Sequence, residues 1–488
     1  MMRIIRKVHA FLGALLSLLF LIWFLSGFMM MFTSFPRLGG KDAKHKTEID
    51  GEGLPSIEKI LSCLPEGEQL SSFRLTTIED KPVLDLKTPN AHYLLSADSL
   101  LKPIESKVSG EWIISYAERW SSYPIMGIDT LRTLDAWTPY SSLKKELPIY
   151  RFRYSDPKKT YLYISSKSGE PLQTCTKTQR IKSSLGTIPH MLYFWQLRQN
   201  RDLWLLIVSI LAGLGAIMTL TGLIVGVQVY VQKYKRSGQL RSPYKKKAYK
   251  WHHIFGTIFG FFVMMFALSG MMSLNDLPEW MVKQHNPHLK NEIRKKDKLE
   301  IQSFLASDYR DLMKLKNVQE ITFQQFAQTP YFIVIHSGEE SQYRLSSDGK
   351  ITPLFFSEDE VKKRIARHLD STMEIELMQE YDNYYCSTSG KSELPIYRIK
   401  ANDPDKSIIY VSPTTGYTRY YNTSGRVKKW IYPAFHSLRF KFFANHPTFR
   451  MVLMMILVLG GSIVSATGVW MGIKYYYRAY RRMSKRKR

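Results

Sequence analysis

Four long apolar runs constrain the fold of this chain more than any other feature of its sequence. Each contains about 20 residues, the length that an α-helix needs to cross the hydrocarbon core of a bilayer. We place the expected membrane spans at 9–32, 202–231, 251–274 and 451–473. Two polar stretches of domain size, 33–201 and 275–450, separate the first span from the second and the third from the fourth. The sequence therefore predicts four transmembrane helices and two large domains on one side of the membrane.

The positive charges determine the predicted orientation of these spans. The net charge of the chain is +27, and 19 of its lysines and arginines lie in the segments 1–8, 232–250 and 474–488, which contain no acidic residue. Cytoplasmic segments of membrane proteins carry such an excess of basic residues. Both termini and the central loop are therefore expected in the cytoplasm, beside anionic membrane lipid. No nucleic-acid recognition motif accompanies the charge, so we expect no nucleic acid as a partner.

The two halves of the chain repeat the same motifs in the same order. Glu-Leu-Pro-Ile-Tyr-Arg occurs at 146–151 and again at 393–398, an offset of 247 residues. At offsets of 243 to 247, further matched positions are His9 and His252, Tyr163 and Tyr410, Gly169 and Gly416, His190 and His436, and Gly222 and Gly468. Such an ordered series indicates an internal duplication. Because both units begin in the cytoplasm, we expect two tandem parallel repeats about a pseudo-twofold axis along the membrane normal.

The outer stretches are predicted to be α+β domains, because short alternating runs in them are separated by turn residues. The expected helices lie at 57–63 and 110–120. The expected strands lie at 73–76, 82–87, 92–95, 149–154 and 161–165 in the first stretch, and at 321–323, 331–336, 341–345, 396–399 and 408–411 in the second.

The matched histidines are the candidate functional residues. His9 and His252 begin spans that run outward, whereas His190 and His436 precede spans that run inward. The repeat axis therefore allows His9 to face His252 near the cytoplasmic side, and His190 to face His436 near the outer side. Two neutral imidazoles on either side of an axis suit the iron of a haem. His253 is an alternative to His252, but it matches an alanine in the first unit, so we prefer His252.

The sequence excludes covalent attachment of a haem at either histidine pair. The chain has three cysteines and no Cys-x-x-Cys-His motif, which covalent haem attachment requires. Nearby basic residues could meet the haem propionates: Arg6, Lys7 and Lys250 inside, and Arg198 and Arg439 outside. Two haems per chain would form an electron pathway across the membrane. Since no dinucleotide-binding glycine motif is present, the expected electron donor is a quinol or a separate cytoplasmic reductase.

The motifs together resemble those of the PepSY-associated transmembrane family, also known as iron-regulated membrane proteins. The resemblance is carried by His-x-x-x-Gly at His9 and His252, by Leu-Ser-Gly at the ends of the odd spans and by Thr-Gly near the ends of the even spans. It also rests on Glu-Leu-Pro-Ile-Tyr-Arg followed by a strand and turn like that at 163–169. It covers nearly the whole chain and implies that each outer domain is PepSY-like.

Within this family the chain is most similar to the ferrisiderophore reductases of the bacterial inner membrane. The resemblance implies a ferric-chelate reductase for iron acquisition, in which two b-type haems carry electrons to a ferric siderophore or another ferric chelate in the periplasm. A different function is also implied, because PepSY domains act as regulatory modules on peptidases. The alternative prediction is therefore a non-enzymatic membrane module that binds a peptidase or another periplasmic partner.

Overall fold

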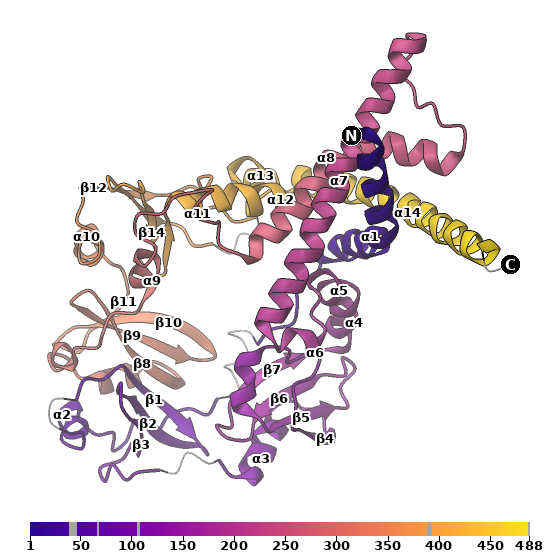
Figure 1. Cartoon of the computed structure of the whole chain (residues 1–488). Coiled ribbons are helices and arrows are strands. Elements are labelled where there is room, and N and C mark those ends of the chain that lie inside the picture. The colour runs from indigo at the N-terminus through magenta and orange to yellow at the C-terminus, as the bar shows by residue number, and fades with distance from the viewer. Residues whose placement is uncertain (39–45, 66–67, 105–107, 389–391, 487–488) are drawn as a thin grey trace.

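Four long helices, three antiparallel sheets and a set of short helices make up the described part of the protein. The computed structural model describes residues 1–38, 46–65, 68–104, 108–388 and 392–486. The long helices lie together, and all three sheets lie beyond one end of them (Figure 1). The chain is thus a membrane α+β protein in which short helices link the sheets to the long helices.

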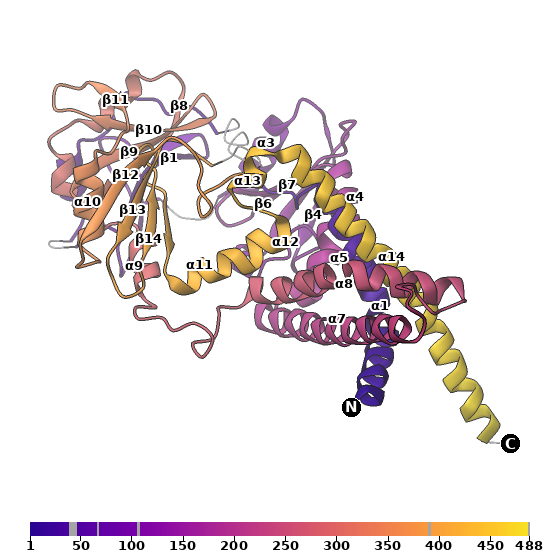
Figure 2. The same cartoon turned by 90° about the horizontal axis from the view of Figure 1, so that it is seen from above.

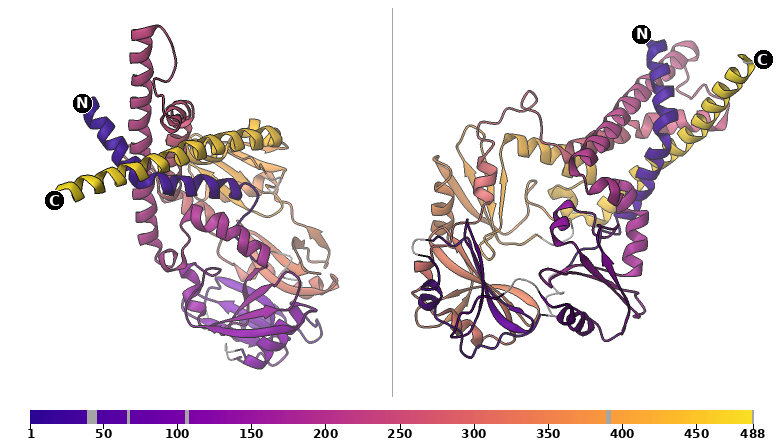
Figure 3. Two further views of the ribbon diagram at one scale, coloured as in Figure 1. Left: turned by 90° about the vertical axis from the view of Figure 1, so that its right-hand side faces the viewer. Right: turned by 60° about the horizontal axis from the view of Figure 1, so that its bottom comes forward.

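The four long helices are α1 (Met2–Met30), α7 (Arg201–Ser237), α8 (Lys247–Leu274) and α14 (Pro447–Arg486). Each is long and apolar enough to cross a membrane. They begin earlier or end later than the predicted spans, because the flanking basic residues are good helix formers and continue the same helices. Contacts join α1 to α14, α14 to α8, α8 to α7 and α7 to α1, so α1 faces α8 diagonally across the bundle. Figure 3 shows the long helices from two further sides.

One sheet combines strands from both polar stretches, so the predicted outer domains at 33–201 and 275–450 share this sheet. Its order is β11-β10-β9-β8-β1-β2-β3. The first stretch supplies β1 (Ser72–Ile78), β2 (Lys81–Lys87) and β3 (His92–Ser96), and the second supplies β8 (Val318–Phe326), β9 (Thr329–His336), β10 (Glu339–Leu345) and β11 (Ile351–Pro353).

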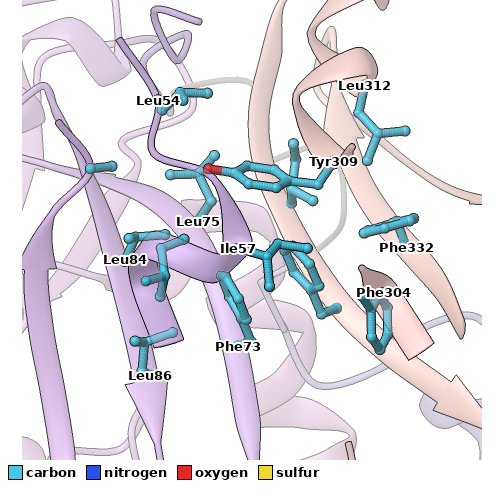
Figure 4. Close-up of a cluster of buried hydrophobic side chains, with 14 of the residues drawn as sticks. Leu54, Ile57, Phe73, Leu75, Leu84, Leu86, Phe304, Tyr309, Leu312 and Phe332 are labelled. Carbon is cyan, nitrogen blue, oxygen red and sulfur yellow. The ribbon is translucent and has the colours of Figure 1, made fainter. Parts of the chain in front are cut away.

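The junction between β1 and β8 is stabilised by aromatic packing. Phe73 of β1 pairs with Phe323 of β8, and their rings stack with centroids 3.9 Å apart. Tyr309 and Phe304 cover this pair within one continuous hydrophobic core (Figure 4). Neither half could bury these rings alone, so pairing the two strands removes an exposed sheet edge from each half.

The other two sheets have the same simple meander order. The first contains β4 (Ile125–Leu131), β5 (Ile149–Tyr154), β6 (Tyr161–Ser165) and β7 (Pro171–Cys175). The second contains β12 (Met373–Met378), β13 (Ile396–Ala401), β14 (Ile408–Val411) and β15 (Thr418–Tyr421). All ten predicted strands are present, and β4, β7, β11, β12 and β15 are additional ones that were not predicted.

Short helices cover the sheets and connect them to the bundle. Helices α3 (Gly110–Trp120) and α10 (Glu358–Ala366) place apolar faces in the cores of the two four-stranded sheets. The other short helices are α2 (Ile57–Leu61), α4 (Lys177–Leu185), α5 (Thr187–Met191), α6 (Trp195–Arg198), α9 (Leu289–Arg294), α11 (Thr423–Lys429), α12 (Phe435–Ser437) and α13 (Lys441–Asn445). Short 3₁₀ segments lie at Ser141–Glu146, Ile301–Phe304 and Tyr309–Lys314, and a π-helical segment lies at Trp430–Ala434.

The duplicated Glu-Leu-Pro-Ile-Tyr-Arg motif has a structural role in both four-stranded sheets. Its arginine bonds to an aspartate that also accepts a hydrogen bond from the matched tyrosine. In the first sheet the carboxylate of Asp135 accepts a hydrogen bond from the guanidinium of Arg151 at 3.2 Å and one from the hydroxyl of Tyr163 at 2.9 Å. In the second sheet the carboxylate of Asp382 accepts a hydrogen bond from the guanidinium of Arg398 at 3.3 Å and one from the hydroxyl of Tyr410 at 2.6 Å. These partly buried networks tie the loop after the first strand of each sheet to the two strands that follow.

Candidate functional site: two histidine pairs in the helix bundle

The four candidate histidines lie in two pairs. The rings of His9 and His252 have centroids 6.2 Å apart, and those of His190 and His436 have centroids 6.3 Å apart. His9 is on α1 and His252 is on α8, diagonally across the bundle. His190 is on α5, which packs on α1, and His436 is on α12, which packs on α8. Each pair therefore joins one histidine from each half of the chain.

The two outer histidines are positioned by the same local structure. His190 lies two residues before Leu192, and His436 lies two residues before Leu438. These leucines have φ values of 50° and 51°, in the left-handed region that ends a helix. Figure 2 shows α11 and α12 in succession between the sheets and α8, the connection that brings His436 to the bundle. The left-handed turns redirect the chain toward α7 and α14. They leave the imidazole of His190 beside α1 and that of His436 beside α8.

Hydrogen bonds fix the protonation of three of the histidines. The Nδ1 atoms of His9, His190 and His252 lie 2.9, 3.0 and 3.1 Å from the carbonyl oxygens of Met218, Trp23 and Val464. A carbonyl oxygen can only accept, so each Nδ1 carries the proton and donates it. In a neutral imidazole this leaves Nε2 with a free lone pair.

A serine has the same effect on the fourth histidine. The hydroxyl of Ser269 donates to the carbonyl of Met265 at 2.5 Å, and its oxygen lies 2.9 Å from Nδ1 of His436. Since the hydroxyl proton is already used, His436 donates from Nδ1. The matching Ser26 donates to Ile22 and lies 3.4 Å from Nδ1 of His190. All four histidines thus present an unprotonated Nε2, which makes no hydrogen bond to any described residue.

Each imidazole rests against a glycine of the duplicated motifs. A Cβ added to Gly222 would lie 2.6 Å from Cε1 of His9, and one added to Gly27 would lie 3.2 Å from Cε1 of His190. A Cβ added to Gly468 would lie 3.8 Å from Cε1 of His252, and one added to Gly270 would lie 3.6 Å from Cε1 of His436. The Leu-Ser-Gly and Thr-Gly motifs therefore supply both the surface on which a ring packs and, at the serines and at Thr467, a polar partner for Nδ1.

The geometry of both pairs fits a haem. An imidazole nitrogen lies about 2 Å from a metal ion that it binds, so two rings on opposite sides of one iron have centroids separated by about 6 Å. Each pair supplies two ligands, the number that a porphyrin leaves open. No group of three or more potential metal ligands occurs in the described part of the chain. A Cβ on Gly13 or on Gly256, one helical turn from His9 and His252, would meet no atom within 4 Å, which leaves room beside the inner pair.

The two pairs lie near opposite ends of the bundle. Along α1, 17 residues separate His9 from Ser26, and along α8 the same number separates His252 from Ser269. At 1.5 Å per residue this corresponds to about 26 Å. Phe20 and Phe24 of α1 occupy the core between the two levels. The arrangement can hold two haems at different depths with aromatic packing between them.

His253, the alternative ligand, faces away from the inner pair. Its Nδ1 lies 3.0 Å from the hydroxyl of Ser242 and its Nε2 lies 3.0 Å from the carbonyl of Gly226. Its ring stacks on that of Tyr230 with centroids 4.2 Å apart. Both nitrogens are therefore already engaged, and His253 holds the loop between α7 and α8 against the bundle.

A cavity of about 680 Å³ opens beside the outer pair. Its inner part is lined by His190, His436 and apolar residues such as Phe24 and Phe266. Its outer part is lined by basic residues, of which the sequence interpretation identified only Arg439; the others are Arg419, Lys429 and Arg450. They were missed because they are scattered along the sequence over 32 positions. A comparison of matched positions in the two halves could have revealed them.

The other residues predicted to meet propionates are less directly placed. Arg198 stacks over the rings of Tyr193 and Trp204, with its Cζ 5.2 and 4.5 Å from their centroids. Arg6 donates to the side chain of Gln228 at 3.3 Å. Lys7 and Lys250 remain predicted partners at the inner end of the bundle.

The comparison with protein families agrees with this architecture. The family model described as the PepSY-associated TM region matches residues 6–474, a range that contains all three sheets, α7, α8 and most of α1 and α14. No curated protein matches the chain. Because the family model covers nearly the whole sequence, the chain belongs to the PepSY-associated transmembrane family.

Proposed function

We propose that the protein is a di-haem b electron-transfer protein that reduces a ferric siderophore or another ferric chelate for iron acquisition. The observation that carries the proposal is the state of the paired histidines. In both pairs the Nδ1 atoms are held by acceptors and the Nε2 atoms are free, at a ring separation that suits one iron between them. Anchoring Nδ1 in this way orients an imidazole and raises its basicity as a metal ligand.

We further propose that the chain lies in the bacterial cytoplasmic (inner) membrane as two parallel repeats. Both termini and the loop between α7 and α8 are then cytoplasmic, and the three sheets are periplasmic. This orientation is supported by the basic segments, which follow the positive-inside rule. It puts His9 and His252 nearest the cytoplasm, and His190 and His436 nearest the ferric substrate.

The chain's own residues would hold and insulate the electron pathway. His9 and His252 would hold the inner haem, and His190 and His436 the outer one. The aromatic core between them keeps water away from the path. When bound, haem supplies one-electron oxidation and reduction. A quinol or a separate cytoplasmic reductase would donate at the inner end, and each electron that leaves the outer end would convert one Fe(III) to Fe(II).

A vectorial assay tests this function. The purified chain is reconstituted with haem in liposomes that contain a membrane-impermeant reductant, and a ferric chelate is added outside with a ferrous-specific dye. We expect Fe(II) to form outside at a rate proportional to the protein content, and to fall to the level of empty liposomes in His190→Ala. Reduction at the same rate without protein, or in His190→Ala, would contradict the proposal.

The alternative, a non-enzymatic module that binds a periplasmic partner, is supported by one surface feature. The edge strand β4 exposes apolar side chains, with Met126 74% and Ile128 44% exposed. An exposed sheet edge of this kind can pair with an extended segment of another protein. If the reconstituted chain moves no electrons but captures such a segment through β4, this alternative would account for the family fold instead.

A further inference from the structure

The cavity beside the outer histidine pair has an unusual distribution of charge. Arg419, Lys429, Arg439 and Arg450 line its outer part, and none of the described residues that line the cavity is an aspartate or a glutamate. Among the residues that the structure describes, none of the four forms an ion pair with a carboxylate. Lys429 is only 7% exposed, and its Nζ donates to the carbonyl of Arg439 at 2.9 Å. Arg419 and Arg450 are half-buried and Arg439 is exposed. A buried positive charge without a counterion, such as that of Lys429, is costly, so the cluster around it is suited to an anionic ligand.

The electrostatic effect of the cluster is visible at its most buried member. Burial lowers the pKa of Lys429, and the thiol of Cys386, 3.6 Å away, opposes this by raising it. Arg419 and Arg439 lower the pKa of Lys429 further, because like charges disfavour its protonated form. In Arg450 the guanidinium donates from Nη1 to the carbonyl of Ser437 at 3.2 Å, whereas its buried Nε has no partner. Donors therefore remain for an incoming acceptor.

The first half of the chain has neutral residues at the matched positions. His190 and His436 are 246 positions apart, and the same offset relates Ser183 to Lys429, Tyr193 to Arg439 and Trp204 to Arg450. The fourth match comes from the strand register. Tyr163 pairs with Gln173, and its counterpart Tyr410 pairs with Arg419, so Gln173 corresponds to Arg419. Four neutral side chains in one half thus correspond to four cations in the other.

The number of cations exceeds the needs of a haem alone. A haem has two propionates, and one basic group is enough to neutralise each, so four cations are twice the number required. At the outer level all four cations come from the second half of the chain. Arginine forks bind carboxylate and other oxyanions through paired N–H donors, and hydrogen bonds between charged groups are the stronger ones. The surplus favours a second, larger anion beside the outer pair.

We infer that Arg419, Lys429, Arg439 and Arg450 form a binding site for a ferric chelate with net negative charge, such as a polycarboxylate complex. The identification of the ligand as a ferric chelate rests on the proposed function. The site selects anionic over neutral complexes and holds them next to the outer histidine pair. The same chemistry could also serve the propionates of an outer haem, and the experiment separates the two sources.

The test uses a metal complex that cannot accept the electron. Ga(III) forms chelates of the same shape and charge as Fe(III) and is not reduced under these conditions, so binding is measured apart from electron transfer. The full chain in lipid nanodiscs is dialysed against the anionic Ga(III) citrate complex or against the neutral Ga(III) tris(acetohydroxamate) complex. We expect binding of the citrate complex that weakens as salt is added, because salt screens the charges, and no comparable binding of the neutral complex.

The variants replace cations by the residues of the first half. Lys429→Ser with Arg439→Tyr should weaken citrate-complex binding by about tenfold or more, as expected for the loss of two charge-assisted contacts. Arg419→Gln is the second variant, and it is used if the double variant does not insert into the membrane. Lys428→Ser is the matched control, because Lys428 does not line the cavity and donates to the carbonyl of Asn275 at 2.8 Å. It should bind like the unmodified chain.

Three results would overturn the inference. The first is equal affinity for the anionic and neutral complexes, and the second is unchanged citrate-complex binding in the double variant and in Arg419→Gln. The third is loss of the outer haem band with unchanged citrate-complex binding, which would assign the cations to propionates alone. Failure of the proposed function is distinguishable, because a chain that carries no haem but binds the citrate complex through these cations would refute electron transfer and leave the anion site standing.

Discussion

Gly222 and His9 are packed so closely that a Cβ on residue 222 would lie 2.6 Å from Cε1 of the histidine. The same imidazole donates from Nδ1 to the carbonyl of Met218, one turn earlier on α7. The ring is therefore held from two sides by a single helix. This contact explains why a glycine follows a threonine at this point in α7, where helix propensity alone would favour a larger residue.

Replacing Gly222 by alanine should move the His9 ring and reduce the binding of the inner haem. The added methyl would overlap the ring, so either the imidazole or α7 has to shift. We expect membranes that contain Gly222→Ala to hold about half of the haem per chain, measured by the pyridine haemochrome assay. Gly213→Ala on the same helix is the control, because its Cβ would meet only the sulfur of Met271 at 3.4 Å. Equal haem loss in both variants would argue against a specific contact with His9.

Ser269→Ala tests the polar partner of His436. Without the hydroxyl oxygen, Nδ1 of His436 loses its acceptor at 2.9 Å, and the imidazole is less firmly oriented. Loss of such a partner typically reduces metal affinity by about 10- to 100-fold. The outer haem should therefore dissociate more readily in a haem-transfer assay. In the control Ser273→Ala, the hydroxyl removed bonds only to the carbonyl of Gly270 on its own helix, and retention should be unchanged. Identical haem retention in Ser269→Ala and the unmodified chain would exclude this role.

His253→Ala should leave the haem content unchanged but destabilise the fold. The side chain links Ser242 to the carbonyl of Gly226 and stacks on Tyr230, so its removal should lower the free energy of unfolding by about 1–3 kcal/mol. His252→Ala should have the opposite pattern, with loss of the inner haem and a folded, inserted chain. Haem content and thermal unfolding of the two variants measure this difference. A haem deficit in His253→Ala at normal stability would reverse our choice of ligand.

The sheet region should lose stability in acid through Glu360. Burial raises the pKa of its carboxyl, but hydrogen bonds from Arg344, Thr329 and the backbone N–H of Ser357 outweigh this and lower the pKa to about 2. Because the folded-state pKa is below the ordinary value of 4.5, the stabilisation is complete above pH 4.5 and is lost as the pH falls from there toward 2.

Glu360→Gln should flatten this part of the pH profile. The measurement is the thermal unfolding midpoint of the full chain in detergent between pH 6 and pH 3. Glu358→Gln, in the same first turn of α10, is the control and should retain the steeper acid dependence. If Glu360→Gln and the unmodified chain lose stability in parallel over this range, Glu360 is not the group responsible.

The sequence contains enough information to predict the spans and the histidine pairs, for a specific reason. A single histidine at a membrane edge is ambiguous, but the copy of His9 at His252 and of His190 at His436 indicates both the level and the partner of each. Local pattern also predicts most strands, because Arg151 and Arg153 alternate with aromatic residues in Ile149–Tyr154, and Ile408–Val411 is a short run of β-branched and aromatic residues. These features depend on residues that are close in sequence or related by the repeat.

The remaining features depend on contacts between distant segments. The pairing of β1 with β8 joins residues about 250 positions apart, and nothing in either strand specifies its partner. The cluster around Lys429 likewise requires the path of the chain through α11 and α12, which the sequence pattern does not define. The acceptors of the histidine Nδ1 atoms are mostly backbone carbonyls, which every residue has, so no sequence signal marks them.

The most direct test of the central claim is the haem content of the purified chain, measured from its dithionite-reduced minus oxidised spectrum. The account predicts b-type bands equivalent to two haems per chain after expression in haem-replete cells. It also predicts about one haem in His9→Ala, with the signal of the outer pair retained, and about one in His436→Ala, with the signal of the inner pair retained. Absence of haem from the folded, unmodified chain, or two haems in both variants, would contradict it.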